Sequence, residues 1–256
     1  MDQAEQAEET GPAEPVTEGT GGLGGLVGGA RVVLWDFDGP ICRLFAGYSA
    51  DRVAGELVGW LERLGLKGML TQEEQVHPDP HVLLGAVNRR RHDSDLVADF
   101  EERLTREELR AVPTAWPTAY ADPLIRTWSA LGVGLAVTTN NSPRVVGEYL
   151  ATRGLLDCFA PHIYGRTQDL HLLKPDPYCL NRALSAMGVA PAQALMVGDT
   201  TSDLTAARRA GVPFLGYARN EEKAKSLREA GAETVVESLQ PVLRLLWEDA
   251  TGRVHV

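Results

Sequence analysis

Apolar and polar positions alternate in blocks along the second half of the chain. Short apolar runs predict strands, and the stretches between them have helical spacing with start or stop residues at their ends. The predicted strands are 133–137, 163–164, 194–197, 214–217 and 235–236, and the predicted helices are 142–153, 176–188, 202–210, 221–230 and a last one through Trp247. Repeated strand–helix units of this kind predict a parallel sheet wound on both faces.

An earlier apolar run, Val32–Trp35, predicts one more buried strand, and it ends in two acids and a glycine. A buried parallel strand is apolar on both faces, so carboxylates belong only at its end. Side chains two residues apart in an extended chain point the same way, so Asp36 and Asp38 are expected to face one site. In open α/β sheets, ligands bind at this edge.

The region between this strand and residue 133 has a different texture. It carries no strong strand signal, and apolar residues recur at helical spacing in 53–64, 82–91, 96–109 and 123–131. We therefore predict an α/β fold, with a doubly wound parallel sheet built from residues 31–45 and 123–256. A helical cap at residues 46–122 is inserted into it.

Residues 1–30 contain six acidic residues, no Lys or Arg and few large apolar side chains. Such a segment buries too little surface to offset its ordering entropy, which predicts a disordered tail. The glycines at 21–29 resemble a nucleotide-binding loop, but such loops follow a strand and open a helix. These glycines precede the first predicted strand, so they are interpreted as a flexible linker.

Composition narrows the classes of partner. The chain has 256 residues, 44% of them hydrophobic, and a formal net charge of −10, which argues against nucleic acid and anionic membranes. The three cysteines, Cys42, Cys158 and Cys179, lack metal or disulfide spacing and suit a reducing cytoplasm. No apolar run has the length of a membrane span, and the acidic N-terminus is unlike a signal peptide. A monomer or a homodimer is expected.

Three further polar groups follow the predicted strands. They are Thr138-Thr139-Asn140, Lys174 just before a helix, and the segment 198–203, which contains Asp199 and Asp203. Strand carboxyl ends share one edge of a parallel sheet, so these groups are expected to lie near Asp36 and Asp38. Clustered carboxylates repel one another unless a cation lies among them, and Mg²⁺ is the natural choice for oxygen ligands. A lysine and helix N-termini beside it would bind a phosphoryl group.

Each element also has an ordinary structural explanation. Asp199 and Asp203 alone suit helix capping, and Lys174 alone suits a solvated surface charge. Asp36 is harder to explain in this way, because a buried carboxylate is costly without partners. Arg43 follows the first acids at the junction with the cap and is a candidate for substrate binding. Taken together, the groups favour a site.

The chain resembles the haloacid dehalogenase-like hydrolase superfamily in four ordered motifs. They are Asp36-Phe37-Asp38-Gly39, Thr139-Asn140, Lys174-Pro175-Asp176-Pro177, and Gly198-Asp199 followed by Asp203. The helical insertion lies where the subclass with an α-helical cap carries it, and the resemblance covers about residues 31 to 247. It implies a Mg²⁺-dependent phosphatase acting on a small phosphorylated metabolite.

The resemblance also implies residue roles. Asp36 would be the nucleophile that forms an aspartyl-phosphate, and Asp38 the general acid and base. Thr139 and Asn140 would bind the phosphoryl group, with Thr139 favoured over Thr138 because it directly precedes Asn140. Lys174 would offset negative charge in the transition state. Metal binding would fall to Asp36, Asp38 through its backbone carbonyl, Asp199 and Asp203, the last as ligand or anchor.

The sequence departs from the family pattern after the first motif, where Pro40 and Ile41 replace the usual Thr and Leu. Pro40 removes a backbone N–H that could face the phosphate or the cap hinge, so the departure bears on substrate preference and cap movement but not on the metal site. Asp38 argues against carbon–halogen chemistry, because dehalogenases proper lack this second acid. Two alternatives stay open, a sugar-phosphate mutase of the same family and a catalytically silent protein that binds a phospho-ligand or a partner.

Overall fold

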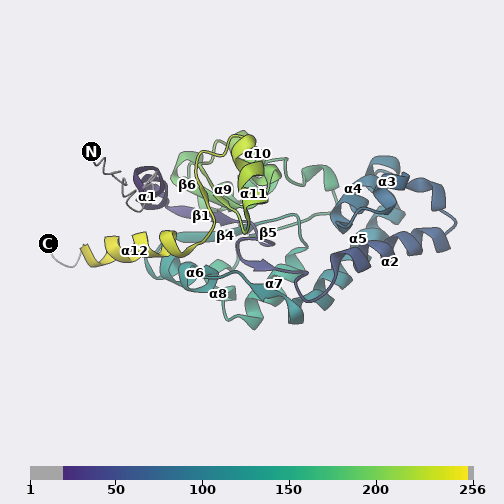
Figure 1. Ribbon diagram of the computed structural model, residues 1–256, viewed down its shortest axis with the longest axis horizontal. Helices are drawn as coiled ribbons and strands as arrows, with labels where there is room; N and C mark the ends of the chain where they lie inside the picture. Colours follow the sequence, from purple (N-terminus) through teal and green to yellow (C-terminus); the bar gives the residue numbers. More distant parts are fainter. Residues whose placement is uncertain (1–19, 253–256) are drawn as a thin grey trace, which may run out of the picture.

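The structure is a computed structural model that describes residues 20–252. Figure 1 shows two parts, a sheet covered by helices and, at the far end of the long axis, a group of helices formed by α2 to α5. Six strands form the sheet, in the order β5-β4-β1-β6-β7-β8, and every pairing is parallel. Their bounds are β1 Val32–Trp35, β4 Gly134–Thr138, β5 Ile163–Tyr164, β6 Ala194–Gly198, β7 Phe214–Tyr217 and β8 Val235–Val236. The predicted doubly wound α/β sheet is confirmed.

Strand β1 lies at the centre of this sheet, between β4 and β6. Val32 pairs with Gly134 on one side and with Ala194 on the other. Strands β4 and β5 follow on one side of β1, and β6, β7 and β8 follow on its other side. The strand order therefore reverses at β1, and such a reversal opens a crevice at the carboxyl end of the strand. The first motif is therefore located at the switch point of the fold.

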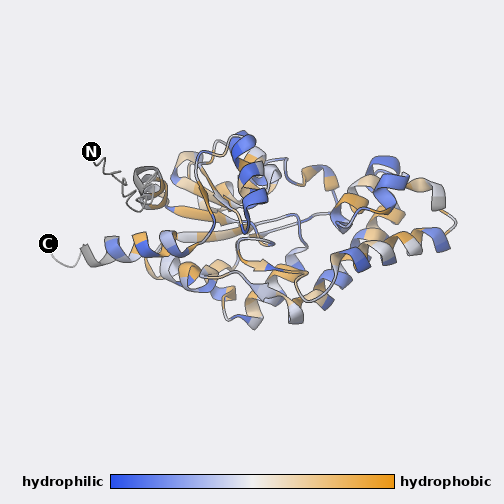
Figure 2. Cartoon of the chain, in the orientation of Figure 1, coloured by the Kyte–Doolittle hydropathy of each residue, from blue (hydrophilic) through white to orange (hydrophobic). Residues whose placement is uncertain are grey.

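Alternate residues of the strands fill two different hydrophobic clusters. Val33 and Trp35 belong to one cluster, and Val32 and Leu34 belong to the other. All four residues of β1 are buried, as expected for a parallel strand covered on both faces. Figure 2 shows the apolar colour concentrated on the strands and the facing sides of the helices.

Helices cover both faces of the sheet. The larger cluster includes buried residues of α1, α6, α7 and α12, whereas the smaller one includes α9 and α10. The bounds are α1 Thr20–Gly29, α6 Ala121–Ala130, α7 Pro143–Thr152, α8 Leu156–Phe159, α9 Tyr178–Met187, α10 Thr201–Ala210, α11 Glu221–Glu229 and α12 Gln240–Gly252, with 3-10 turns η3 Leu170–Leu172 and η4 Pro191–Gln193. Within residues 20–252, no helix is both long and apolar enough to cross a membrane.

The glycine-rich segment differs from its prediction as a flexible linker. Thr20–Gly29 form helix α1, which packs against α12 and β6. Leu23 and Val27, four residues apart, are buried in the larger cluster. These two side chains form a narrow apolar face that a glycine-rich sequence does not reveal. Packing against α12 and β6 therefore stabilises the helix. The remainder of the predicted tail, residues 1–19, lies outside the described residues.

The insertion is helical, as its spacing predicts. Its helices are α2 Ala50–Arg63, α3 Gln72–Gln75, α4 Pro80–Arg90 and α5 Asp95–Ala111, with 3-10 turns η1 Lys67–Met69 and η2 Val112–Thr114. They enclose a separate cluster that contains Val53, Trp60, Leu83 and Phe100. We call α2 to α5 the cap. The bounds 46 and 122 remain a prediction.

Two short strands, β2 (Cys42–Arg43) and β3 (Trp116–Pro117), pair antiparallel where the chain enters and leaves the cap. The apolar pattern does not predict them, because Arg43 and Pro117 interrupt any apolar run at these positions. They place Arg43 opposite Trp116.

Helix starts follow the predicted signals with small shifts. Helix α9 starts after Pro177, and the side chain of Asp176 accepts a hydrogen bond from the Tyr178 backbone N–H at 2.9 Å. Helix α10 is capped by Thr200 rather than Ser202.

We expect Val27→Ala to destabilise the protein, because its side chain is 3% exposed and packs in the larger cluster. The free energy of unfolding should fall by about 1–2 kcal/mol through lost burial and a residual cavity. Urea denaturation measures this change. The matched control is Val76→Ala in the cap, where the side chain is 77% exposed and the same deletion should cost less than about 0.5 kcal/mol. Equal effects would show that α1 does not contribute to the core.

Candidate active site

A small cavity of about 190 Å³ opens at the carboxyl end of β1, and we call it the central cavity. It brings together side chains from β1, the loop after β4, the segment before α9, the start of α10 and the cap. Its lining residues are Asp36, Asp38, Asp79, His81, Thr139, Asn140, Asn141, Lys174, Thr200, Ser202 and Asp203. The sheet edge thus collects the polar groups that the sequence predicts there. Asp199 lies beside this group, and Arg43 does not line the central cavity.

Lys174 lies between two buried carboxylates. Its Nζ is 2.8 Å from Asp36 Oδ1 and 2.5 Å from Asp203 Oδ1, and it donates to the backbone carbonyl of Thr138 at 2.9 Å. All three charged side chains are at most 9% exposed. Removing the ammonium would leave two buried carboxylates without a counter-charge, which is strongly destabilising. The interpretation of Lys174 as a solvated charge is therefore wrong.

Asn140 fixes the backbone of Lys174. Its Oδ1 accepts from the Lys174 backbone N–H at 2.8 Å, and its Nδ2 donates to the Lys174 carbonyl at 3.1 Å. Both ends of the amide are thus engaged. The loop after β4 and the segment before α9 are joined by these two bonds, which hold the ammonium group in place.

Asp203 combines helix capping with site assembly. Its Oδ2 accepts from the backbone N–H groups of Asp199 and Thr200 at 3.2 and 3.0 Å, while its other oxygen faces Lys174. Thr200 and Asp203 form a capping box at the start of α10. The two interpretations of this motif are therefore compatible.

Three carboxylates form a candidate metal site. Asp36, Asp199 and Asp203 are buried, and one oxygen from each lies within 4.8 Å of the others. Asp199 Oδ1 is buried without a hydrogen-bond partner, and its Oδ2 pairs with Lys223. A set of carboxylate oxygens with an unpartnered member fits a hard cation such as Mg²⁺. The carboxylate of Asp38 does not belong to this set.

Burial governs the protonation of these acids. It raises the pKa of Asp36 to about 6, with Asp203 adding to the rise and Lys174 opposing it. Burial likewise raises the pKa of Asp199 to about 7 against the influence of Lys223. A cation at the site would favour the ionised forms.

Asp38 lies in a different environment from Asp36. Its Oδ1 accepts from the Leu44 backbone N–H at 2.9 Å, and no ion pair to it is formed by the residues of the described chain. Burial raises its pKa, and the Leu44 bond opposes that rise. Burial thus raises the pKa of both acids, but Asp36 is paired with an ammonium group, whereas Asp38 accepts a single backbone N–H.

The loop after β4 separates the two threonines. The Thr138 hydroxyl donates to the sulfur of Met196 at 3.4 Å, away from the central cavity, whereas Thr139 lines it. The Thr139 hydroxyl donates to Asn141 Oδ1 at 3.1 Å and accepts from the Asn141 backbone N–H at 3.2 Å. Thr139, which the sequence favours over Thr138, is therefore the threonine that lines the central cavity.

A buried charge network joins the cap to this loop, and sequence analysis missed it. Arg166, in the loop after β5, pairs with Glu108 of α5 at 2.9 Å and is also 2.9 Å from Glu101. Glu108 accepts from the Asn141 side chain at 3.0 Å and contacts His81 of α4 at 3.0 Å. The network thus holds His81 and Asp79 of the cap at the edge of the central cavity.

The charges of the network stabilise one another. Burial opposes the charge of His81, but hydrogen bonds with Asp79 and Glu108 raise its pKa to about 9. Burial also opposes the charge of Glu108, but Arg166 and His81 lower its pKa to about 2. One signal was available, since Glu108 continues the apolar spacing of Phe100 and Leu104 in α5. An acid in such a stripe needs a buried partner.

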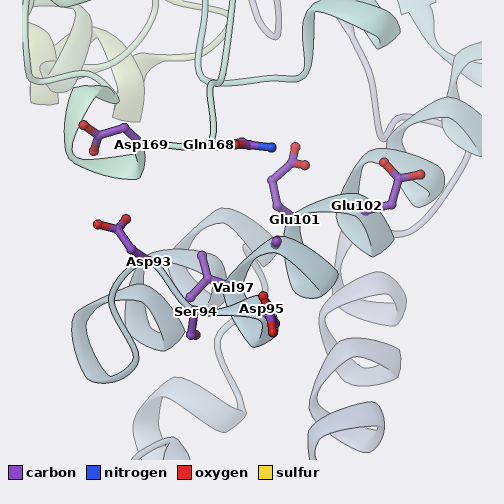
Figure 3. A pocket seen from close by; sticks show the side chains of 9 residues that line it. Asp93, Ser94, Asp95, Val97, Glu101, Glu102, Gln168 and Asp169 are labelled. Atoms are coloured by element: carbon purple, nitrogen blue, oxygen red, sulfur yellow. The ribbon is translucent and has the colours of Figure 1, made fainter.

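The largest cavity is not the best candidate. It has a volume of about 620 Å³ and lies between α5 and the loop that holds Gln168 and Asp169 (Figure 3). Five acids line it, namely Asp93, Asp95, Glu101, Glu102 and Asp169. No Lys or Arg lines it, so it would repel a phosphate.

Comparison with known proteins gives consistent matches. A family model described as a haloacid dehalogenase-like hydrolase matches residues 30–211. A phosphoglycolate phosphatase from Thiobacillus denitrificans is 34% identical over 115 residues, which cover 45% of this chain and 50% of that protein. A phosphoglycolate phosphatase from Neisseria meningitidis is 28% identical over 197 residues, covering 73% and 79%.

A solved structure has the same fold. A haloacid dehalogenase-like hydrolase from Bacteroides fragilis aligns with a TM-score of 0.63 at 21% identity, and the alignment covers 82% of this chain and 98% of that one. The chain spans about half the length of the first curated relatives it matches.

Gly39→Ala should disrupt the candidate metal site. Gly39 has a φ of 128°, and an added Cβ would lie 2.3 Å from the Asp199 carboxyl carbon. The backbone strain alone costs about 1–3 kcal/mol, so the melting temperature should fall. Gly55→Ala in helix α2 is the matched control, because nothing lies within 4 Å of its added Cβ and alanine favours the helix. A Gly39→Ala protein as stable as the control would contradict this account.

The network should also make stability depend on pH. The folded-state pKa of His81 is raised from 6.5 to about 9, so its stabilisation is fully present below about pH 6.5 and is lost as the pH rises through about 9. We expect the melting temperature of the wild type to fall across this window more steeply than that of His81→Gln. Parallel curves for the two proteins would show that His81 is not charged in the folded state.

Proposed function

Because this chain belongs to the haloacid dehalogenase-like hydrolase family, we propose that it is a Mg²⁺-dependent phosphatase that hydrolyses a small phosphorylated metabolite. The reaction would pass through an aspartyl-phosphate on Asp36. The catalytic roles given to Asp36, Asp38, Thr139 and Lys174 are part of this proposal.

The observation that carries the proposal is the contrast between two carboxylates in one cavity. Asp36 is paired with an ammonium group at 2.8 Å and belongs to the candidate metal set, whereas Asp38 lies outside that set and accepts only a backbone N–H. A nucleophile must be ionised, and a general acid must hold a proton. The environments of the two acids therefore match two different roles.

In the first step, an oxygen of Asp36 attacks phosphorus, and the bond between phosphorus and the ester oxygen breaks. The departing oxygen takes the proton of Asp38 and leaves as an alcohol. Lys174, 2.8 Å from Asp36, offsets the negative charge that the nucleophile and the phosphoryl group share. The Thr139 hydroxyl faces the same cavity and would bind a phosphoryl oxygen.

In the second step, water attacks the aspartyl-phosphate. Asp38, now ionised, accepts a proton from the water, and the bond between phosphorus and Asp36 breaks. Inorganic phosphate leaves, and both carboxylates return to their starting states. The cap residues Asp79 and His81 border the cavity, so they would limit the access of bulk water.

Asp36 and Asp199, with the Asp38 backbone carbonyl, would hold Mg²⁺. Asp203 is more suitable as an anchor, because both of its oxygens are engaged by Thr200 and Lys174. When bound, the ion supplies positive charge that stabilises the pentavalent phosphoryl group. The relatives named phosphoglycolate phosphatase support a small substrate, as does the cavity volume of about 190 Å³.

Purified protein with Mg²⁺ should release phosphate from p-nitrophenyl phosphate. Asp36→Asn should reduce the rate by roughly 10³-fold or more, because an amide cannot act as the nucleophile. Asp157→Asn is the matched control, because the Asp157 side chain is exposed in helix α8, and it should retain full activity. Phosphate release is measured with and without a chelator of divalent cations.

Two results would contradict the proposal. If wild type and Asp36→Asn are equally inactive on a broad panel of phosphate esters, a ligand-binding role is favoured instead. If a labelled bisphosphate returns as an isomer without free phosphate, the protein is a mutase.

A further inference from the structure

A second cavity adjoins the central cavity and has no role in the reaction described above. Its volume is about 390 Å³, and we call it the side cavity. The two cavities share three lining residues, Asp38, Asp79 and His81. The two cavities therefore adjoin at these three side chains.

Two arginines from distant parts of the chain line the side cavity. Arg43 is in strand β2, and Arg219 follows strand β7. Neither forms an ion pair with any carboxylate of residues 20–252. Both act on the Tyr217 hydroxyl: burial and Asp199 raise its pKa, whereas Arg219 and Arg43 oppose the rise. Both guanidinium groups thus favour the ionised form of the same tyrosine.

The exposed side chain of Arg43 lies over an aromatic ring. Its guanidinium lies 5.4 Å from the ring centroid of Trp116, the residue paired with it across β2 and β3. Contact with an aromatic ring occupies the flat surface of a guanidinium and leaves its N–H groups free at the edge. This edge suits bidentate binding of a carboxylate or a phosphate.

The acids of the side cavity are compensated or have another role. Asp79 is 3.3 Å from His81, whose pKa is raised. Asp51 is in the first turn of α2, where the helix N-terminus stabilises negative charge. Asp38 belongs to the central cavity as well, where it is the proposed proton donor. The two arginines therefore remain as charges without partners.

We propose that the side cavity binds a second anionic group of the substrate, a carboxylate or a phosphate, through Arg43 and Arg219. This inference rests on the proposed phosphatase function. It limits the substrate class to small phosphate monoesters that carry another anion a short distance from the ester oxygen. Esters with a neutral end would lack this interaction and would be poor substrates.

The test compares two esters of similar size, 2-phosphoglycolate and ethyl phosphate, of which only the first has a carboxylate. We expect wild-type kcat/KM to be about 10- to 100-fold higher for 2-phosphoglycolate. Arg43→Gln and Arg219→Gln should each remove about 10-fold or more of that preference, mainly by raising KM. Their kcat/KM for ethyl phosphate should stay within about 2-fold of the wild type.

Arg244→Gln on the exposed side of α12 is the control for loss of an arginine. It should leave kcat/KM unchanged for both esters. Trp116→Ala is the control for orientation. It keeps both charges but releases Arg43, so it should raise KM for 2-phosphoglycolate alone. A second pair of esters, 1,3-propanediol bisphosphate and propyl phosphate, shows whether the second anion is a phosphate or a carboxylate.

If the wild-type kcat/KM is equal for 2-phosphoglycolate and ethyl phosphate, the inference is overturned and the phosphatase function stays intact. The same holds if the arginine variants lose activity equally on both esters. If the wild type hydrolyses no ester, the proposed function fails, and calorimetric binding of 2-phosphoglycolate and ethyl phosphate decides about the side cavity. Equal affinities would then overturn the inference as well.

Discussion

The ion pair of Lys174 with Asp36 and Asp203 is the interaction on which the site depends. A buried ammonium between two buried carboxylates is stable only if all three are held in register, since each charge has lost its hydration. The elements that hold them are strand β1, helix α10 and the loop after β4, whose Asn140 fixes the Lys174 backbone. The sheet therefore determines the site through its central strand and the two strands beside it, β4 and β6.

Most of the sheet could be predicted because the relevant signals are local. Buried parallel strands such as Val32–Trp35 are short apolar runs, and the helices between them begin and end at recognisable residues. Helix α1 could not be predicted, because Leu23 and Val27 are separated by glycines and become a buried face only against α12. The pairing of β2 with β3 could not be predicted for a related reason, since the two strands are far apart in sequence.

The site shows the same division. Residues at strand ends could be assigned, because a parallel sheet brings all its carboxyl ends to one edge. Glu108 and Arg166 could not be paired, since 58 positions separate them and neither type of residue specifies its partner. Asn140 illustrates a third case, in which the residue was identified but its contacts were not. Its amide holds Lys174 in place, a task that no pattern in the sequence reveals.

Helices α1 and α12, the first and last described elements, pack against each other at the end of the molecule opposite the cap (Figure 1). The cavities lie between these two ends, at the carboxyl edge of the sheet. A fusion partner or surface linker joined directly to α1 or α12 would consequently be attached at the end of the molecule opposite the cap. Immobilised protein would keep its cap free to face the solution, which suits this chain to assays on a solid support.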